Sequence, residues 1–292
     1  MTSLRANGIT IECETIGEAG RPPLLLVMGL GAQLVSWPKE LCQAFADQGF
    51  LVIRYDNRDV GLSTKMEGPP PDLAAAAAGD LSGAGYGIAA MADDGIGVMD
   101  ALGIDRAHLV GVSMGGMIVQ HMAMNFPDRL LSLCSIMSAP TGSLFADPPT
   151  DEATAALTRA PATSRQEASD NALAGAVAIG SPGFPLDEAR VRARAELSYD
   201  RCFYPQGFNR QLLAVLSSGD WSDRLAEVNV PTLVIHGSAD PLVRPSWGEA
   251  TARAIPGARL LVIPGMGHDL PEGAWPELIE AIVDNAGKAT SP

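Results

Sequence analysis

The five residues Gly111-Val112-Ser113-Met114-Gly115 combine a nucleophile with the small residues that can expose it. A short apolar run typical of a buried strand precedes them, and an apolar segment of helical length follows. A Gly-x-Ser-x-Gly run between a strand and a helix indicates a sharp turn, which strains the serine backbone and brings neighbouring segments close. We therefore predict that Ser113 projects from a sheet edge into a pocket and acts as a nucleophile.

A serine nucleophile needs a base that takes its proton, and the sequence has four histidines, at 108, 121, 236 and 268. His268 lies in a Gly-rich turn directly after the apolar run 259–263, so we place it in the loop at the end of a strand and predict that it is the base. His121 follows Ser113 on the same predicted helix beside methionines, which favours a structural role. His108 is expected to begin a strand.

The predicted acid is Asp240, which lies on a turn after the apolar run 231–236. An aspartate before a proline is also a common turn former, and Asp223 is the second candidate for the acid. For Asp56 and Arg58 we favour a charged network that holds a loop near the site over a catalytic role.

In this order the motifs Gly-Val-Ser-Met-Gly at 111–115, His-Gly-Ser-Ala-Asp at 236–240 and Gly-Met-Gly-His at 265–268 resemble the α/β-hydrolase superfamily over most of the chain. The resemblance implies a triad in which Ser113 is the nucleophile, His268 acts as general base and then acid, and Asp240 orients and stabilises the imidazolium. His236 matches a strand-end position that is usually structural in the family.

The resemblance also implies two backbone donors for the oxyanion, the amides of Met114 and Leu30. The second lies in the loop Met28-Gly29-Leu30-Gly31, where many family members have His-Gly. The missing histidine leaves the backbone donor in place but changes what anchors the loop. Because Met28, Leu30 and Met114 are apolar, they are candidate substrate contacts and favour an uncharged or hydrophobic group beside the nucleophile.

The Val-Met-Gly variant at 27–29, together with the segment 54–63, is similar to the bacterial esterase branch that contains aclacinomycin methylesterase. This narrower likeness favours hydrolysis of a carboxylic ester, by a carboxylesterase or methylesterase. The same triad also serves C–C bond hydrolases and perhydrolases, and a ligand-binding protein can retain the fold. Hydrolases with an aspartate nucleophile are disfavoured because position 113 is serine.

Composition restricts the partners. The formal charge is −14, from 34 acidic and 20 basic residues, which disfavours nucleic acids and anionic membranes. No run reaches membrane-spanning length, and the cysteines at 13, 42, 134 and 202 are scattered in a way that indicates free, buried thiols. We expect a cytoplasmic enzyme for a small-molecule ester, without a metal or another cofactor, since the histidines lack ligand spacing.

The elements that must position these residues alternate between strands and helices. Residues 1–16 are expected to form a hairpin with its turn at Asn7-Gly8. Apolar runs indicate core strands at 24–28, 51–55, 108–112, 132–137, 232–236 and 259–263. Their separation by helical segments predicts a mostly parallel sheet flanked by helices, with ligands at the carboxyl ends of the strands.

Two stretches interrupt the alternation. We interpret residues 68–95 as a surface loop that leads into a helix at about Ile88. Residues 141–220 contain Ala- and Arg-rich helical patterns, and in the superfamily an insertion at this point forms a helical cap. The predicted organisation is therefore a core in two parts, 1–140 and 221–292, with a cap between them. The aromatic candidates for the pocket are Phe184, Tyr199, Phe203, Tyr204, Phe208 and Trp221, each of which could instead pack the cap against the core.

Overall fold

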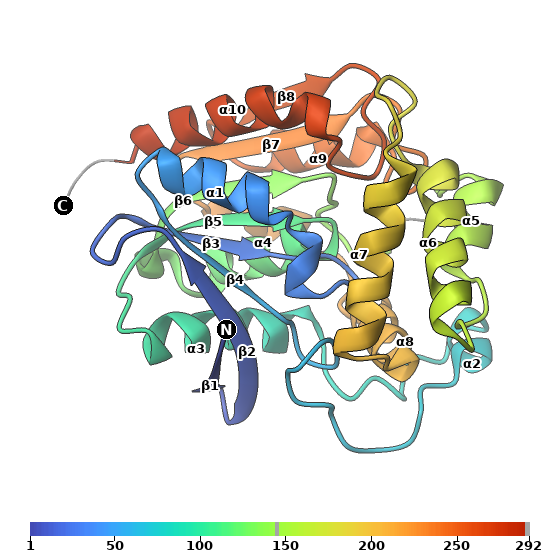
Figure 1. The fold of residues 1–292 in the computed structure, drawn as a ribbon. Helices are drawn as coiled ribbons and strands as arrows, with labels where there is room; N and C mark the ends of the chain where they lie inside the picture. Colours follow the sequence, from blue (N-terminus) through green and yellow to red (C-terminus); the bar gives the residue numbers. More distant parts are fainter. Residues whose placement is uncertain (144–145, 290–292) are drawn as a thin grey trace.

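The protein is built on one eight-stranded sheet with the strand order β1-β2-β4-β3-β5-β6-β7-β8 (Figure 1). The computed structural model describes residues 1–143 and 146–289. The pairs β1–β2 and β2–β4 are antiparallel, and every later neighbouring pair is parallel. The strands are β1 (Thr2–Ala6), β2 (Ile9–Ile16), β3 (Pro23–Val27), β4 (Leu51–Tyr55), β5 (Ala107–Val112), β6 (Leu130–Ile136), β7 (Thr232–Gly237) and β8 (Arg259–Ile263). The predicted mostly parallel sheet is confirmed, and the strand boundaries agree to within about two residues.

The predicted N-terminal hairpin is also confirmed. β1 pairs with β2, and Asn7 and Gly8 connect them with φ angles of 45° and 77°. A two-residue turn with positive φ at both positions follows the twist of the flanking strands, and Asn-Gly adopts that conformation readily.

Helices cover both faces of the sheet (Figure 1). On one face α1 (Lys39–Asp47) and α10 (Trp275–Gly287) pack on the strands; on the other lie α3 (Ile88–Ala101), α4 (Met114–Asn125) and α9 (Pro245–Ala254). The buried apolar residues form one cluster on each face. Consecutive strand residues point to opposite faces, so in β3 Leu25 and Val27 belong to one cluster while Leu24 and Leu26 belong to the other. A strand buried on both sides explains the uninterrupted apolar run in the sequence.

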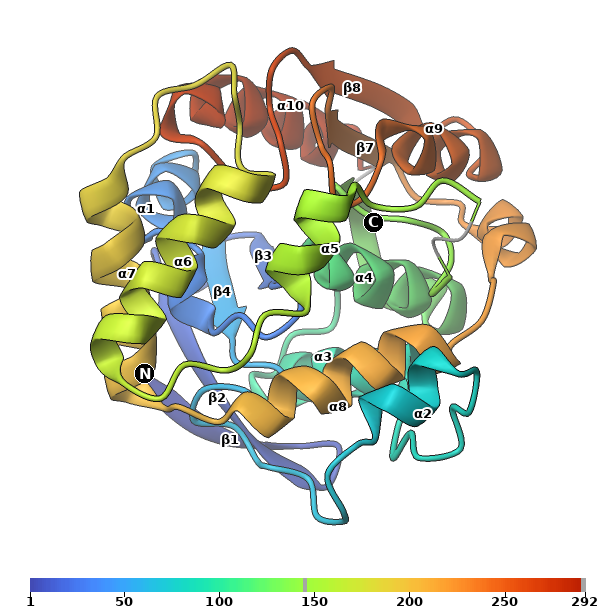
Figure 2. The ribbon, with the colours of Figure 1, turned by 90° about the vertical axis from the view of Figure 1, so that its right-hand side faces the viewer.

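Four helices lie beyond the carboxyl ends of the parallel strands, where Figure 2 shows them facing the viewer. They are α5 (Asp151–Leu157), α6 (Arg165–Ile179), α7 (Glu188–Arg201) and α8 (Pro205–Ser217). Side chains cap the first turns of α6 and α7, where Ser164 accepts a hydrogen bond from the Glu167 amide and Asp187 accepts one from the Arg190 amide.

The two ends of this helical segment meet. Thr141 forms an isolated antiparallel bridge with Asp220, and the Gly142 amide donates to the Gly219 carbonyl over 2.7 Å. These contacts lie at the predicted limits of the cap, 141 and 220. The division into cap and core remains a prediction, and residues 144–145 of that range lie outside the described part of the chain.

The interpretation of residues 68–95 as a loop is wrong over five of them, which form the short helix α2 (Leu73–Ala77). The Asp72 carboxylate caps this helix by accepting hydrogen bonds of 2.9 Å from the amides of Ala74 and Ala75. Alanine has the highest helix propensity, so a capped alanine run forms a turn of helix even at the surface. The following helix, α3, begins at Ile88 as predicted.

The cysteines are free, and three of them, Cys13, Cys42 and Cys134, are buried. Burial raises the pKa values of Cys13 and Cys42 to about 11, so both are neutral packing residues at ordinary pH. The expectation of burial is wrong for Cys202, which is half-exposed at the end of α7. Within the described residues, no helix has both the length and the apolar character that crossing a membrane requires.

Candidate active site

Ser113 occupies a strained turn between β5 and α4, with φ 55° and ψ −123°. Its amide still donates to the Ile136 carbonyl of β6 over 2.9 Å, so the strand pairing extends to the turn itself. A Cβ atom on Gly111 would lie 2.1 Å from the Gly115 carbonyl oxygen, and one on Gly115 would lie 2.1 Å from the Val27 carbonyl oxygen. Both flanking positions therefore require glycine for close backbone approach, as the sequence motif indicates.

The structure brings Ser113, His268 and Asp240 together in one hydrogen-bonded row. The Ser113 Oγ atom lies 3.0 Å from His268 Nε2, and His268 Nδ1 lies 2.7 Å from Asp240 Oδ2. Ser113, His268 and Asp240 follow the carboxyl ends of β5, β8 and β7; β7 adjoins β8, and β6 lies between β5 and β7. Asp223, the other candidate acid, is exposed in a 3₁₀ helix over Ser222–Glu227.

Asp240 is fully buried, and its environment keeps it ionised. Its Oδ1 atom accepts hydrogen bonds of 2.9 Å from the amides of Leu242 and Val243. Burial opposes ionisation, but the nearby His268, and then His236, outweigh it and lower the pKa of the Asp240 carboxyl below its usual value. An ionised carboxylate can only accept, so His268 Nδ1 carries a proton and the neutral ring presents a bare Nε2 to the serine hydroxyl.

His236 also lies near the Asp240 carboxylate. Its Nε2 atom lies 2.7 Å from the Val243 carbonyl oxygen, which can only accept, and 3.5 Å from Asp240 Oδ2. A Cβ atom on Gly248 of α9 would lie 2.3 Å from His236 Nδ1, so this glycine makes room for the ring. The position is compatible with the structural role that the family resemblance implies.

The other two histidines lie away from the row. His108 is buried in β5, with Nδ1 2.9 Å from the Ser132 hydroxyl. His121 is buried in α4 and packs edge-on against Trp221, with ring centroids 4.7 Å apart. Burial lowers the pKa of each ring to about 4, so both are neutral at ordinary pH.

The end of α6 holds the loop that carries His268. The His268 amide donates to the Ile179 carbonyl over 2.7 Å, and the Gly267 amide donates to the Ser181 hydroxyl over 2.8 Å. The orientation of His268 therefore depends on the helical segment above the sheet as well as on β8.

The loop 28–31 packs against the turn at Ser113, since a Cβ atom on Gly29 would lie 3.1 Å from the Ser113 Cβ atom. Across residues 1–143 and 146–289, the amides of Leu30 and Met114 have no hydrogen-bond partner. Two free amides near a serine hydroxyl are the kind of donor that an oxyanion needs.

Two side chains that the sequence did not single out anchor this loop. The Asn57 side-chain amide donates to the Met28 carbonyl over 2.9 Å. Gln211 of α8 accepts a hydrogen bond of 2.8 Å from the Gly31 amide and donates one of 2.7 Å to the Arg58 carbonyl. Asn57 lies within the segment 54–63, which the sequence comparison with the esterase branch includes. Gln211 lies 180 positions from Gly31 in the sequence, and no local sequence pattern identifies it as a contact of this loop.

The charged network expected around Asp56 and Arg58 is present. Arg58 forms a buried ion pair with Asp94, with 2.6 Å between Nε and Oδ2. Asp56 accepts a 2.6 Å hydrogen bond from the Leu34 amide and pairs with Arg201 of α7 over 3.1 Å. The network ties the strand-end loops to the helical segment.

A cavity of about 630 Å³ opens at the Ser113 hydroxyl. Met28, Leu30 and Met114 all line it, and each of α5, α6, α7 and α8 contributes to its wall. The wall is mainly apolar; its other members include Met117, Met137, Leu157, Ile179, Leu212, Val215, Leu216, Leu242, Val243 and Leu270. Such a site can bury a mostly hydrophobic ligand against Ser113.

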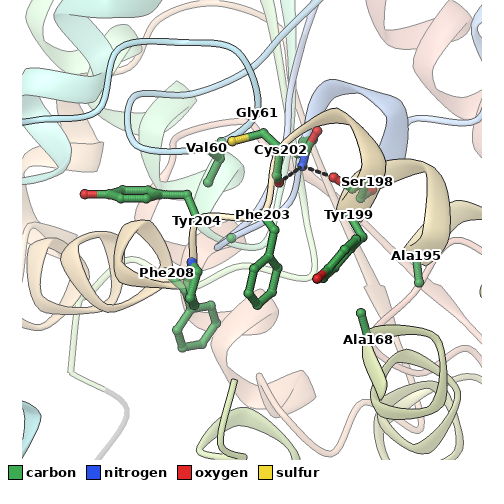
Figure 3. A pocket seen from close by; sticks show the side chains of 13 residues that line it. Val60, Gly61, Ala168, Ala195, Ser198, Tyr199, Cys202, Phe203, Tyr204 and Phe208 are labelled. Atoms are coloured by element: carbon green, nitrogen blue, oxygen red, sulfur yellow. Dashed lines mark hydrogen bonds between the residues drawn. The ribbon is translucent and has the colours of Figure 1, made fainter. Parts of the chain in front are cut away.

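A second, smaller hollow of about 200 Å³ lies beside α7 and the residues Val60 and Gly61 (Figure 3). Three of the aromatic candidates, Tyr199, Phe203 and Tyr204, line this hollow and not the cavity at Ser113. Phe208 lines both.

The two remaining candidates pack against the two apolar clusters of the core. Trp221 is buried and donates its indole N–H to Gln120 over 2.8 Å. Phe184 packs against the core cluster that contains α10 and approaches Gly273. Of the six aromatic candidates, all of which the structure describes, Phe208 alone lines the cavity at Ser113.

Across the described residues, no three His, Cys, Asp or Glu side chains are grouped so that they could hold a metal ion. The row from Asp240 to Ser113 is suited to proton transfer from a hydroxyl that attacks a carbonyl carbon.

Comparison with known proteins agrees with the fold. The family model for the alpha/beta hydrolase fold matches residues 22–273. Among curated proteins, the chain is 29% identical to the rhodomycin D methylesterase DauP of Streptomyces sp. (strain C5), over 97% of this chain and 96% of that protein. It is 27% identical to 3-oxoadipate enol-lactonase 2 of Acinetobacter baylyi, over 85% of this chain and 82% of that protein.

Among solved structures, the enol-lactonase of Burkholderia xenovorans LB400 superposes with a TM-score of 0.74 at 24% identity, over 98% of this chain and 100% of that chain. This likeness concerns the fold.

Proposed function

This chain belongs to the α/β-hydrolase family, and on that basis we propose that it is a serine hydrolase that cleaves a carboxylic ester through an acyl-enzyme on Ser113. The observation that carries the proposal is the unbroken row from a buried, ionised Asp240 through His268 to Ser113, which ends in an apolar cavity. The similarity to proteins named rhodomycin D methylesterase supports an ester as the substrate and hydrolase chemistry in general.

In the first step the Ser113 hydroxyl oxygen attacks the ester carbonyl while His268 Nε2, 3.0 Å away, takes its proton. The imidazole becomes a cation. Asp240 holds the Nδ1–H over 2.7 Å, which fixes the tautomer and stabilises the positive charge as it forms.

Negative charge develops at the same time on the carbonyl oxygen. In this mechanism the amides of Leu30 and Met114 donate to it. Because both are backbone groups on segments held by other contacts, they need little rearrangement as the charge appears. Removing a single donor of this kind typically slows the chemical step by about 100- to 1,000-fold.

The tetrahedral intermediate then collapses, and His268 returns its proton to the departing alcohol. Water enters and gives a proton to the same nitrogen as it attacks the acyl-serine. The carboxylic acid leaves, and Ser113 is regenerated. Each proton lost by a nucleophile is thus recovered by a leaving group.

The helical segment 141–220 serves in this proposal as a cap. Its four helices line the cavity, so they limit access of water to the catalytic row and set the shape of the ester that fits. The apolar wall beside Ser113 favours an uncharged ester group at the point of attack.

Product analysis tests the proposed reaction. We expect the native chain to convert methyl and p-nitrophenyl esters into equal amounts of alcohol and carboxylic acid, and Ser113→Ala to lose this activity. Matched reactions with a C–C hydrolase substrate and with hydrogen peroxide as acceptor separate the related chemistries. Tight binding of esters without turnover would overturn the proposal and indicate a ligand-binding protein.

A further inference from the structure

Helix α7 carries four arginines, and three of them have carboxylate partners. Arg190 pairs with Glu272 over 3.0 Å, Arg192 with Asp170 over 2.6 Å, and Arg201 with Asp56 over 3.1 Å. Three of the four arginine charges on the helix are therefore compensated by carboxylates of other segments.

Arg194, the fourth, lines the cavity at Ser113. Among the described residues its guanidinium has neither a hydrogen-bond partner nor an ion-pair partner within 4.0 Å. It is also the one Lys or Arg side chain among the described residues that line this cavity. A cation with five hydrogen-bond donors is thus placed in an otherwise mainly apolar wall.

Asp269, the acidic residue whose charge favours the ionised form of Arg194, does not form an ion pair with it. Asp269 also lines the cavity, but it accepts a hydrogen bond from the Ser181 hydroxyl and stays beyond ion-pair distance of the guanidinium. Burial lowers the pKa of Arg194 from its ordinary value, although Asp269 acts in the opposite direction. The charge is therefore poorly compensated within the chain.

We propose that Arg194 binds a carboxylate carried by the substrate, so that the enzyme prefers an ester with an acidic group at some distance from the ester bond. This inference rests on the proposed esterase function and deepens it. The planar guanidinium presents paired N–H donors that fit the two oxygens of a carboxylate. The apolar wall would contact the remainder of the ligand, and the ester group would lie at Ser113.

The experiment uses two pairs of esters that differ only by a carboxylate in place of an isopropyl group. For the acyl side, the pair is the p-nitrophenyl monoester of glutaric acid and p-nitrophenyl 5-methylhexanoate. For the alcohol side, it is 4-acetoxybutanoate and 4-methylpentyl acetate. We expect the native chain to favour the acidic member of at least one pair by about tenfold or more in kcat/KM, the size of effect that a charge-assisted hydrogen bond supplies.

Three variants identify the group responsible. Arg194→Met is expected to lose the preference for the acidic ester while still hydrolysing the neutral one. Arg194→Lys should keep part of it, because it retains the charge but not the fork. Arg192→Gln removes an arginine of the same helix that already has a partner, and it should behave as the native chain does. Thermal unfolding of each variant checks that the fold is intact.

Equal rates on both members of both pairs, or an undiminished preference in Arg194→Met, would overturn the inference. If Arg194→Met does not fold, two other measurements test the inference. A preference for the acidic ester that is due to charge must weaken in Arg194→Lys, and it must also weaken in the native chain as the salt concentration rises. Failure of the proposed function looks different, because the native chain would then hydrolyse none of the four esters. Hydrolysis of the neutral esters without discrimination would leave the esterase standing and remove only the role of Arg194.

Discussion

At the scale of single residues, the proposed chemistry depends on which nitrogen of His268 carries the proton. Asp240 decides this because it is ionised and buried, and because its second oxygen is already occupied by the amides of Leu242 and Val243. The remaining oxygen can only accept the Nδ1–H of His268.

Replacing Asp240 with asparagine should therefore reverse the tautomer. The backbone amides will retain the carbonyl oxygen, so the NH₂ group faces Nδ1 and forces the proton onto Nε2, where it blocks transfer from Ser113. We expect kcat to fall by about 1,000- to 10,000-fold, with little change in the folded structure. Steady-state kinetics on a p-nitrophenyl ester measure this. The matched control, Asp223→Asn, changes the other candidate acid and should leave kcat unaffected; a similar loss in both variants would contradict the assignment.

The residues that the sequence identified at this scale are those with a local signature. Ser113 lies between two glycines that only a sharp turn requires, and Asp240 and His268 each follow an apolar run directly. Arg194 and Gln211 could not be found this way. Each is one polar residue on a helix with many, and each becomes distinctive only because of the remote segment that it meets.

At the scale of elements, α8 connects the helical segment 141–220, the proposed cap, to the proposed oxyanion loop. Gln211 links the Gly31 amide to the Arg58 carbonyl, and Phe208 on the same helix lies against Gly31. Because Gly31 has φ 69° and a Cβ atom there would lie 2.7 Å from the Phe208 ring, the helix and the loop fit closely. We interpret this contact as what replaces the histidine found in many family members.

If so, Gln211→Met should move the Leu30 amide and lower kcat by about 10- to 100-fold with a smaller effect on KM. It also leaves two backbone groups unpaired, which should cost about 1–3 kcal/mol of unfolding free energy. A boronic acid that mimics the tetrahedral intermediate separates the two effects, because its affinity should fall in proportion to kcat/KM. The exposed Gln206 on the same helix provides the control, Gln206→Met. Lower stability with unchanged kcat and boronate affinity would show that Gln211 only supports the fold.

The sequence predicted those elements for which the spacing of apolar residues and the position of turn-forming residues agree. The core strands and the Asn-Gly hairpin were evident for this reason. The short helix α2 was missed, since a five-residue alanine helix has no amphipathic pattern and is recognised only from its Asp72 cap. The arrangement of the cap aromatics could not be predicted, because their packing depends on how the cap helices sit over the sheet.

At the scale of the whole molecule, two apolar clusters, one on each face of the sheet, fix the relative positions of the strand ends. That core also encloses His108 and His121 as neutral rings, and the structure gives His121 no hydrogen-bond partner for either nitrogen within the described residues. Buried neutral histidines make the stability of the fold depend on pH.

Burial lowers the pKa of both rings to about 4 in the folded chain, whereas an unfolded histidine titrates near 6.5. Between these values the unfolded state binds more protons, so the free energy of unfolding should fall as the pH drops from about 6.5 to about 4. In His121→Phe, we expect this fall to be smaller by about 1–3 kcal/mol. Urea unfolding at a series of pH values measures it, and parallel curves for the native chain and the variant would contradict the account.

The central claim is a covalent acyl-enzyme on Ser113, and intact-mass spectrometry with rapid mixing tests it most directly. The native chain and Ser113→Ala are mixed with a p-nitrophenyl ester and quenched during the first turnover. We predict a burst of p-nitrophenolate and a mass increase equal to one acyl group, located on the peptide that contains Ser113, with both signals absent in the variant. Turnover of the ester by the native chain without any acylated protein, or equal acylation of the variant, would contradict the mechanism.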